Sequence, residues 1–268
     1  MFGISRQGYY QRQQRVGKRL KELSQVKAEV IEQRIHLPRL GTRKLYHRLN
    51  KQIRSKGIKL GRDALFALLR SEHLLIRPKR SYHKTTNSKH WLHKHPNLLG
   101  GRKPVKPNEI WVSDITYIDT AKQTTYLSLI TDAYSRKIVG YHLHENLHTD
   151  GVAGALQMAL KREKFDALIH HSDRGLQYCS AQYQQLLTKN KITPSMTDGY
   201  DCYQNALAER VNGILKQEFL IVKPVDIHQA RKMIGQAVAL YNERRPHLAL
   251  NYQTPNTIHK QKILDSDT

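Results

Sequence analysis

Three acidic residues stand at positions where carboxylates need a special reason to be present. Asp114 interrupts an apolar, β-branched run, where an aspartate has low strand propensity and a high desolvation cost. Asp173 follows an apolar run at the point where a buried strand would end, a usual place for a site in α/β sheets. Glu209 lies in a stretch of helical periodicity, and Asn205 and Lys216 are expected on the same helix face.

Carboxylates of this kind could support metal-dependent chemistry on phosphodiesters. Acidic side chains that converge on one edge repel one another unless cations lie between them. Mg²⁺ prefers hard oxygen ligands and leaves coordination positions for water and phosphate oxygens. Two such ions about 4 Å apart can activate an attacking oxygen and stabilise a leaving one. A single acidic residue is more often a surface residue or a helix cap, so the interpretation depends on all three together.

Charge divides the chain into two parts. Residues 1–107 contain 27 Lys and Arg against 5 Asp and Glu, a net charge of +22. Residues 108–268 contain 18 against 17, a net charge of +1. A concentrated basic excess favours a polyanionic partner, usually DNA or RNA, because phosphates release counterions on binding. A generally adhesive basic arm is the alternative.

Composition narrows the class of protein. Of the 268 residues, 39% are apolar and 25% are charged, as in ordinary globular proteins. No apolar stretch has the length of a membrane span, and the basic N-terminus lacks the apolar segment of a signal peptide. The two cysteines, Cys179 and Cys202, are too few for a disulfide framework or a four-cysteine zinc site. A reducing cytoplasm is the expected location.

The basic part is expected to be helical and to bind DNA. A helix is predicted over 5–33, and two short helices within 41–57 and 61–76 are joined by a turn at Gly57. Two short helices with a Gly-containing turn in a basic segment suggest a helix-turn-helix over residues 1–80. A helical hairpin with a solvated basic surface is the alternative. Candidate DNA contacts in this region are Arg43, Lys44 and Arg62.

Residues 81–107 are rich in Lys, His, Pro, Gly, Ser and Thr and lack periodicity, which predicts a basic linker. The histidines His90, His93 and His95 have no cysteine or carboxylate nearby to complete a zinc site. They are interpreted as exposed linker residues.

The remainder has the pattern of an α/β domain. Three strand-like runs follow one another at short intervals and predict antiparallel neighbours, and strands then alternate with amphipathic helices. The prediction is a mixed five-stranded sheet flanked by helices. Strands are expected within 109–120, 124–134, 136–145, 165–173 and 192–196, and helices within 151–164, 180–191, 205–221 and 228–245.

Four sequence blocks in this order carry a resemblance to a known family. They are WVSDITYI around Asp114, HSDRGLQY around Asp173, NALAERVNGILKQEF around Glu209, and YNERRPHLAL near the C-terminus. With 35 residues between Asp173 and Glu209, the chain resembles the OrfB-type transposases of the insertion-sequence-3 family over nearly its whole length. That family is related to retroviral integrases and has an RNase H-like fold.

The resemblance implies a function and roles for particular residues. The expected activity is metal-dependent cleavage at the ends of an insertion sequence followed by strand transfer, with Mg²⁺ or Mn²⁺, two ions, as the cofactor. Asp114, Asp173 and Glu209 are then both catalytic residues and metal ligands. Lys216, which occupies the family's basic position seven residues after the glutamate, is expected to contact DNA, and Asn205 and Arg174 are further candidates.

The resemblance also implies an organisation and a set of partners. The RNase H-like integrase core is expected over 108–222, followed by a C-terminal helical extension over 223–268. The expected partners are terminal inverted repeats, target DNA, further copies of the chain as a homo-oligomer, and an upstream OrfA product as partner or fusion. A bacterial cytoplasm, in association with the nucleoid and without a membrane partner, is the expected location.

The chain departs from related sequences in two places. Many relatives have Asp-Asn-Ala before the glutamate, whereas this chain has Gln204, Asn205 and Ala206, which removes one carboxylate. No cysteine precedes Cys179, so the zinc module of retroviral integrases is absent. The alternatives to a transposase are an RNase H-like nuclease without joining activity and a non-catalytic DNA-binding regulator.

Several residues near these blocks allow two interpretations each. His170 and His171 could tune the acidic site, although a buried histidine at a strand end is more often structural. In the C-terminal block, Arg244, Arg245 and His247 could contact DNA or could anchor the end of the last long helix before Pro246.

Overall fold

The computed structural model describes residues 5–77, 91–198 and 205–264. The chain divides into two compact units, unit 1 (Met1–Pro78) and unit 2 (Lys79–Thr268). The first boundary lies close to the predicted end of the basic region at residue 80. In the described part of the chain, no helix combines the length and the apolar character needed to cross a membrane.

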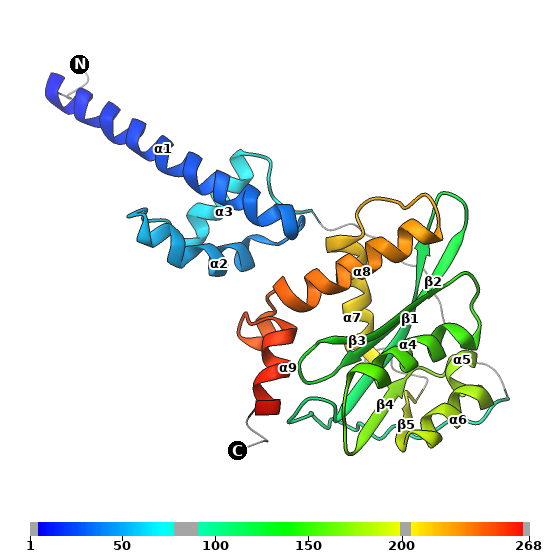
Figure 1. Ribbon diagram of the computed structural model, residues 1–268. Coiled ribbons are helices and arrows are strands. Elements are labelled where there is room, and N and C mark those ends of the chain that lie inside the picture. Colours follow the sequence, from blue (N-terminus) through cyan, green and yellow to red (C-terminus); the bar gives the residue numbers. More distant parts are fainter. Residues whose placement is uncertain (1–4, 78–90, 199–204, 265–268) are drawn as a thin grey trace. The chain divides into compact units, whose positions relative to one another are not determined.

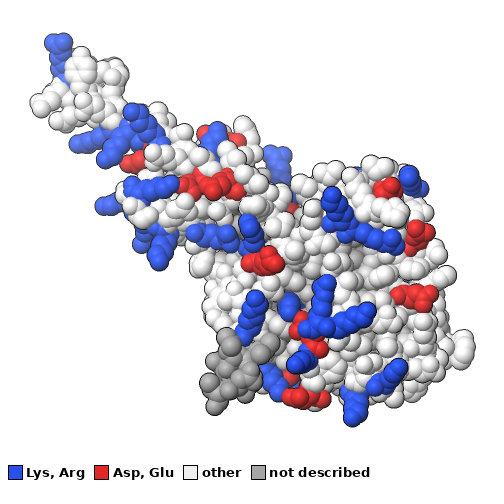
Figure 2. Space-filling view, viewed as in Figure 1, with Lys and Arg blue, Asp and Glu red and all other residues white. Residues whose placement is uncertain are grey.

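Unit 1 contains three helices (Figure 1): α1 (Arg6–His36), α2 (Thr42–Ser55) and α3 (Arg62–Ser71). Leu45, Leu49 and Ile53 of α2 are buried, as their spacing predicts. The C-terminal half of α1 packs through Val26 and Val30, whereas its first four turns are almost entirely exposed. Lys and Arg side chains are spread over much of the visible surface of these helices (Figure 2).

Unit 2 is built on a five-stranded sheet with the order β3-β2-β1-β4-β5. The strand pairs β1–β2 and β2–β3 are antiparallel, and the pairs β1–β4 and β4–β5 are parallel. The predicted meander and mixed sheet are confirmed. The strands are β1 (Ile110–Asp119), β2 (Thr124–Asp132), β3 (Ile138–His144), β4 (Leu168–Ser172) and β5 (Ile192–Met196).

Helices cover both faces of this sheet (Figure 1). On one face α4, α5 and α6 pack around Trp111, Leu156 and Tyr183. On the other face α7, a π-helical turn (η2) and α8 pack around Leu127 and Tyr241. Because apolar side chains of the strands point to both faces, the sheet is buried and can hold polar side chains rigidly. The helices are α4 (Thr149–Arg162), α5 (Leu176–Cys179), α6 (Ala181–Lys189), α7 (Ala206–Ile214), η2 (Leu215–Phe219) and α8 (Ile227–Arg244).

The described part of the predicted linker, residues 91–107, lies against unit 2. The amide of Met196 on β5 donates to the carbonyl of Pro96 at 3.3 Å. The amide of Leu98 donates to Ser195 Oγ at 2.9 Å, and His95 Nε2 lies 2.8 Å from Gln184 Oε1. This segment therefore differs from the free linker that its composition predicts, because it satisfies polar groups of β5 and α6. His90 lies outside the described residues.

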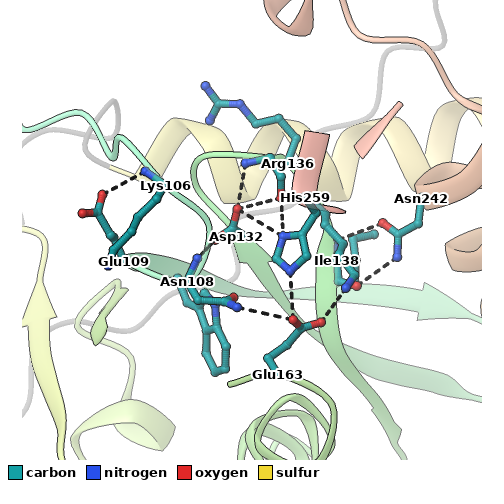
Figure 3. A network of polar contacts seen from close by, with 12 residues as sticks. Lys106, Asn108, Glu109, Asp132, Arg136, Ile138, Glu163, Asn242 and His259 are labelled. Carbon is teal, nitrogen blue, oxygen red and sulfur yellow. Dashed lines mark hydrogen bonds and ion pairs between the residues drawn. The ribbon is translucent and has the colours of Figure 1, made fainter. Parts of the chain in front are cut away.

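The C-terminal helix α9 (Pro255–Leu264) is joined to the sheet by a buried polar network (Figure 3). His259 Nε2 donates to Glu163 Oε2 at 2.8 Å, and His259 Nδ1 lies 2.9 Å from Ser135 Oγ. Ser135 Oγ donates in turn to Asp132 Oδ1 at 2.6 Å, and Lys137 Nζ donates to Glu163 Oε1 at 2.5 Å. The region predicted as a C-terminal extension, 223–268, thus contributes α8 and α9 to unit 2.

Candidate active site

Asp114 lies on β1 in the middle of the sheet, where its partly buried carboxylate accepts two hydrogen bonds. The amide of Ile115 donates to Oδ1 at 2.9 Å, and Asn212 Nδ2 donates to Oδ2 at 2.8 Å. Burial and, after it, the nearby charge of Asp173 raise the pKa of Asp114 to about 8, because these two effects exceed what the donors offset. The strand therefore holds an acid that is unfavourable as a free carboxylate.

Asp173 is brought beside Asp114 by the parallel pairing of β1 with β4. Val112 of β1 is paired with His171 of β4. Asp114 and Asp173 each follow two residues after these paired residues. The amide of Gly175 donates to Asp173 Oδ1 at 3.0 Å. A Cβ at position 175 would lie 3.0 Å from that same oxygen. An added Cβ would therefore crowd the Asp173 carboxylate, whereas the backbone φ of −65° at this position is available to any residue.

Glu209 is an exposed residue in the first turn of α7, which packs on β1 and β2. Burial and the charge of Asp173 both raise its pKa. Glu209 in turn contributes to the raised pKa of Asp114. The three predicted acids therefore lie within electrostatic range of one another at one region of the sheet.

Two asparagines of this segment fasten the glutamate helix to β1. Asn205 Nδ2 donates to the carbonyl of Ser113 at 3.0 Å, and Asn212 Nδ2 donates to Asp114. Both side chains are 4% exposed. Asn205, predicted to contact DNA, is thus buried at the N-terminus of α7, where its amide holds the helix to the strand.

Asn212 was not among the sequence candidates. Its position, three residues after Glu209 and four before Lys216, places it on the helix face already expected for those residues. Lys216 Nζ lies 3.4 Å from Thr116 Oγ1, and Thr116 shares a face of β1 with Asp114. Burial lowers the pKa of Lys216. The helical spacing was the signal that could have found Asn212.

The donor set suits a hard divalent cation. The side chains offer carboxylate oxygens, and the Oδ1 atoms of Asn205 and Asn212 are buried without a hydrogen-bond partner among the described residues. In the ranges that the structure describes, no three or more His, Cys, Asp and Glu side chains come together as a group that could hold a metal ion. The acids interact through their charges, because Asp173 and Glu209 contribute to the raised pKa of Asp114, and Asp173 contributes to that of Glu209.

A buried polar layer supports the parts of β1 and β4 that adjoin the two aspartates. Tyr178 OH lies 2.9 Å from Ser113 Oγ, and His170 Nε2 lies 2.9 Å from Tyr183 OH. Burial lowers the pKa of His170 to about 3, so its imidazole is neutral. His171 is also buried, with Nδ1 2.9 Å from Ser195 Oγ. This placement favours the structural interpretation of both histidines.

The other predicted DNA contacts have varied surroundings. Arg174 follows Asp173 and is partly buried. In unit 1, Arg43 and Lys44 lie in the first turn of α2, and Arg62 begins α3 and forms an exposed pair with Asp63 at 3.0 Å. Gln204, where many relatives have aspartate, lies outside the described residues.

In the block YNERRPHLAL, the surroundings of Arg245 favour its role as an anchor for the end of α8 over contact with DNA. Arg245 and His247 are 4% and 9% exposed, whereas Arg244, the last residue of α8, is exposed. Arg245 Nε and Nη2 donate to the two carboxylate oxygens of Glu218 at 2.8 and 2.6 Å. The guanidinium is thus engaged inside unit 2.

Two integrase core domain families match this chain, one over residues 104–202 and the other over residues 190–255. Together these matches span Asp114, Asp173, Glu209 and all of α8.

Proteins of two insertion elements are similar to this chain over longer stretches. The chain is 35% identical over 261 residues to the 31 kDa protein of insertion element IS600 of Shigella sonnei. This alignment covers 95% of this chain and 94% of that protein. It is also 34% identical over 173 residues to the transposase InsF for insertion sequence IS3A of Escherichia coli strain K12, which covers 64% of this chain and 60% of that protein.

A solved structure supports the fold. A chain of the simian T-cell lymphotropic virus intasome in complex with the PP2A regulatory subunit B56 gamma aligns with a TM-score of 0.52 at 18% identity. The alignment covers 82% of this chain and 74% of that chain. At this level of identity the likeness shows the RNase H-like fold predicted from the sequence.

Proposed function

The chain belongs to the insertion-sequence transposases of the IS3 family that carry an integrase core domain, and on this premise we propose that Asp114, Asp173 and Glu209 bind divalent metal ions for DNA cleavage and strand transfer. As a transposase of this kind, the protein is a polynucleotidyl transferase that acts on DNA. The metal ligands, the use of two ions, Mg²⁺ or Mn²⁺, and the division of roles among the residues are our proposal.

The observation that carries the proposal is the parallel register of β1 and β4, which places Asp114 and Asp173 at matching positions, where burial and then the charge of Asp173 raise the pKa of Asp114 to about 8. A protein that only bound DNA would gain nothing from placing three acids within electrostatic range of one another. A divalent cation would lower that cost and favour the charged form of each carboxylate. Metal ions, when bound, would activate the attacking oxygen and stabilise the leaving oxygen of a phosphodiester.

The protein's own residues orient these acids. The backbone amide of Ile115 fixes one oxygen of Asp114, and the backbone amide of Gly175 fixes one oxygen of Asp173. Asn212 fixes the second oxygen of Asp114 in one direction. The side-chain amide of Asn205 holds the start of α7 to β1, and this contact fixes the position of Glu209 relative to the sheet.

Basic residues supply the contacts to the DNA backbone on this proposal. Lys216 reaches Thr116 on the face of β1 that carries Asp114, and Arg174 follows Asp173 directly in the sequence. Arg43, Lys44 and Arg62 of unit 1 are the candidates for binding the terminal inverted repeats. Replacing one phosphate-contacting lysine or arginine with alanine should weaken binding about equally across sequences and reduce the salt slope by about one.

The partners follow from the same proposal. Terminal inverted repeats and target DNA would both be bound during strand transfer, by further copies of this chain in a homo-oligomer. An upstream OrfA product would act as a partner or a fusion.

The test is strand cleavage and joining on DNA that carries the element's own terminal repeats. Wild type is compared with Glu209→Gln, with and without Mg²⁺, and parallel reactions contain the OrfA product. Glu145→Gln, which changes an exposed glutamate between β3 and α4, is the matched control. We expect Mg²⁺-dependent joined products that fall about a thousandfold or more in Glu209→Gln, the scale of losing a catalytic residue.

Other outcomes would point elsewhere. Nicked DNA without joined products would favour a nuclease. Binding without either product, with OrfA present, would favour a DNA-binding regulator. Equal joining by Glu209→Gln and Glu145→Gln would overturn the role of Glu209.

A further inference from the structure

Two adjacent arginines at the end of α8 have different surroundings. Arg244 is exposed, whereas Arg245 is 4% exposed and paired with Glu218 through two hydrogen bonds. A planar guanidinium that meets both oxygens of a carboxylate fixes direction as well as distance. The sequence block YNERRPHLAL therefore contains one arginine that is a structural contact inside the unit.

Aromatic neighbours hold the Arg245 side chain in place. Its guanidinium carbon lies 5.9 Å from the centre of the Tyr241 ring, and Nη1 lies 3.1 Å from a ring nitrogen of His247. Tyr241 is completely buried, and its hydroxyl donates to the carbonyl of Arg136 at 3.0 Å. The position of the Arg245 guanidinium is thus fixed by core residues of unit 2 as well as by Glu218.

Glu218 lies in the π-helical turn Leu215–Phe219, which continues α7 beyond Ile214. π-helical turns are rare, poorly stable on their own and frequent at functional sites. Leu215 is 1% exposed and packs in the core beneath the turn. The turn is therefore fixed at two residues, by burial of Leu215 and by the ion pair of Glu218.

Lys216 lies between those two fixed residues. Its ammonium lies 3.4 Å from Thr116 Oγ1, and Thr116 stands two residues after Asp114 on the same face of β1. The direction of the Lys216 side chain depends on the backbone of the π-helical turn. Any change that let the turn relax to a regular α-helix would rotate Lys216 relative to the acids.

We propose that Arg245 is a positioning residue for DNA strand transfer, which acts through Glu218 to fix the π-helical turn and direct Lys216 toward the DNA beside Asp114. This inference rests on the proposed function, because it takes Lys216 as a DNA contact. Arg245 itself touches no DNA.

The experiment compares Arg245→Lys with Arg244→Lys in the full chain. Both changes keep the charge, but lysine cannot form the two-pronged contact to Glu218. We expect joining to fall by about 10- to 100-fold in Arg245→Lys, the scale of a small misplacement of a substrate-binding group, and to stay near wild type in Arg244→Lys. Glu218→Gln, which removes the same ion pair from the other side with little change in volume, is the second variant if Arg245→Lys does not fold.

A double-mutant cycle with Lys216→Ala separates positioning from general damage. If Arg245 acts through Lys216, adding Arg245→Lys to Lys216→Ala should produce less than about a twofold further loss of joining. The salt slope of DNA binding should also fall in Arg245→Lys, by up to about one, although no charge has been removed.

The inference is overturned if the two losses multiply, or if Arg245→Lys and Arg244→Lys join equally well. It is also overturned if Lys216→Ala joins like wild type. In each case Glu209→Gln reports separately on the proposed function, because loss of joining in that variant does not depend on Arg245.

Discussion

Unit 2 contains two clusters of acidic side chains whose environments are opposite. In the network of Asp132, Glu163 and His259, each carboxylate meets donors or cations. Burial alone would raise the pKa of Glu163, but hydrogen bonds from His259 and Lys137 lower it to about 2. In the candidate active site, burial and neighbouring acids raise the pKa of Asp114 to about 8.

The difference separates acids that hold the fold together from acids that are available for chemistry. A buried carboxylate with a structural role is paired with donors or cations of the same chain, as Glu163 is with Lys137 and His259. In the candidate active site the pKa values of Asp114 and Glu209 are raised instead, and perturbed pKa values of this kind are common at functional sites. Replacements in the two clusters should therefore have opposite effects on stability and on activity.

The largest expected effect is on DNA joining by Asp114→Asn and Asp173→Asn. Each should reduce metal-dependent joining by about a thousandfold or more. Asp114→Asn should not lower the free energy of unfolding in metal-free buffer, because the amide removes a carboxyl whose charged form is disfavoured by burial and by Asp173. For Asp114, whose folded pKa of about 8 lies above its unfolded value, the folded carboxyl stays largely protonated at pH 7 while the unfolded one is ionised, so stability falls as pH rises between the two values. Asparagine removes this dependence on pH. Joining assays and chemical denaturation measure the two quantities, and a large loss of stability would contradict the comparison.

The next largest expected effect is a loss of stability on changing the network of Asp132, Glu163 and His259. Glu163→Gln removes the carboxylate partner of Lys137 and one of the two carboxylates near His259, which keeps Asp132. Breaking a buried pair in this way should cost about 3–5 kcal/mol of unfolding free energy. Glu145→Gln, at an exposed position, should change it by less than about 0.5 kcal/mol. Equal effects in thermal or chemical unfolding would show that the buried network contributes little.

The pH dependence of stability gives a third distinction. The folded pKa of Glu163 is depressed, so its stabilisation is present above its ordinary value of 4.5 and is lost as pH falls toward about 2. Burial lowers the pKa of His259, but hydrogen bonds to Asp132 and Glu163 raise it above its ordinary value of 6.5. Its stabilisation is present below 6.5 and is lost as pH rises through the folded pKa.

The network should therefore stabilise the fold most between these ordinary values. Unfolding free energies measured across pH for wild type and Glu163→Gln should differ most near pH 5 to 6 and converge toward low pH. A constant difference at every pH would mean that the network does not depend on these charges.

The smallest effects concern two glycines of unit 2. Gly175→Ala places a Cβ 3.0 Å from Asp173 Oδ1, so we expect weaker metal dependence of joining with little change in stability. A Cβ added at Gly213 in α7 would meet no atom within 4 Å beyond the helix's own backbone, so Gly213→Ala should stabilise the helix by up to about 1 kcal/mol. Metal titrations of joining and thermal unfolding distinguish the two, and similar behaviour of both variants would remove the special role of Gly175.

Much of the fold was predictable from local patterns. Alternation of apolar residues indicated the three antiparallel strands, and the apolar run before Asp173 indicated β4. Four ordered sequence blocks also allowed the acids to be named before their pairing was known. Parallel pairing then explains why Asp114 and Asp173 meet, since their strands are neighbours in the sheet.

The contacts that could not be predicted join residues far apart in the chain. Nothing near His259 indicates that its partners would be Asp132 and Glu163, because tertiary packing alone brings α9 to them. Similarly, two adjacent arginines look alike in sequence, and only the fold distinguishes Arg245 from Arg244. The composition of residues 91–107 resembles a linker, yet hydrogen bonds with β5 and α6 decide its path.

The most direct test of the comparison is the effect of a divalent cation on thermal unfolding. Mn²⁺ or Mg²⁺ should raise the Tm of wild type and of Glu163→Gln, because a ligand that binds only the folded state stabilises it. The same ions should leave the Tm of Asp114→Asn and Asp173→Asn nearly unchanged. An equal rise in all four proteins would contradict the claim that these aspartates bind the metal.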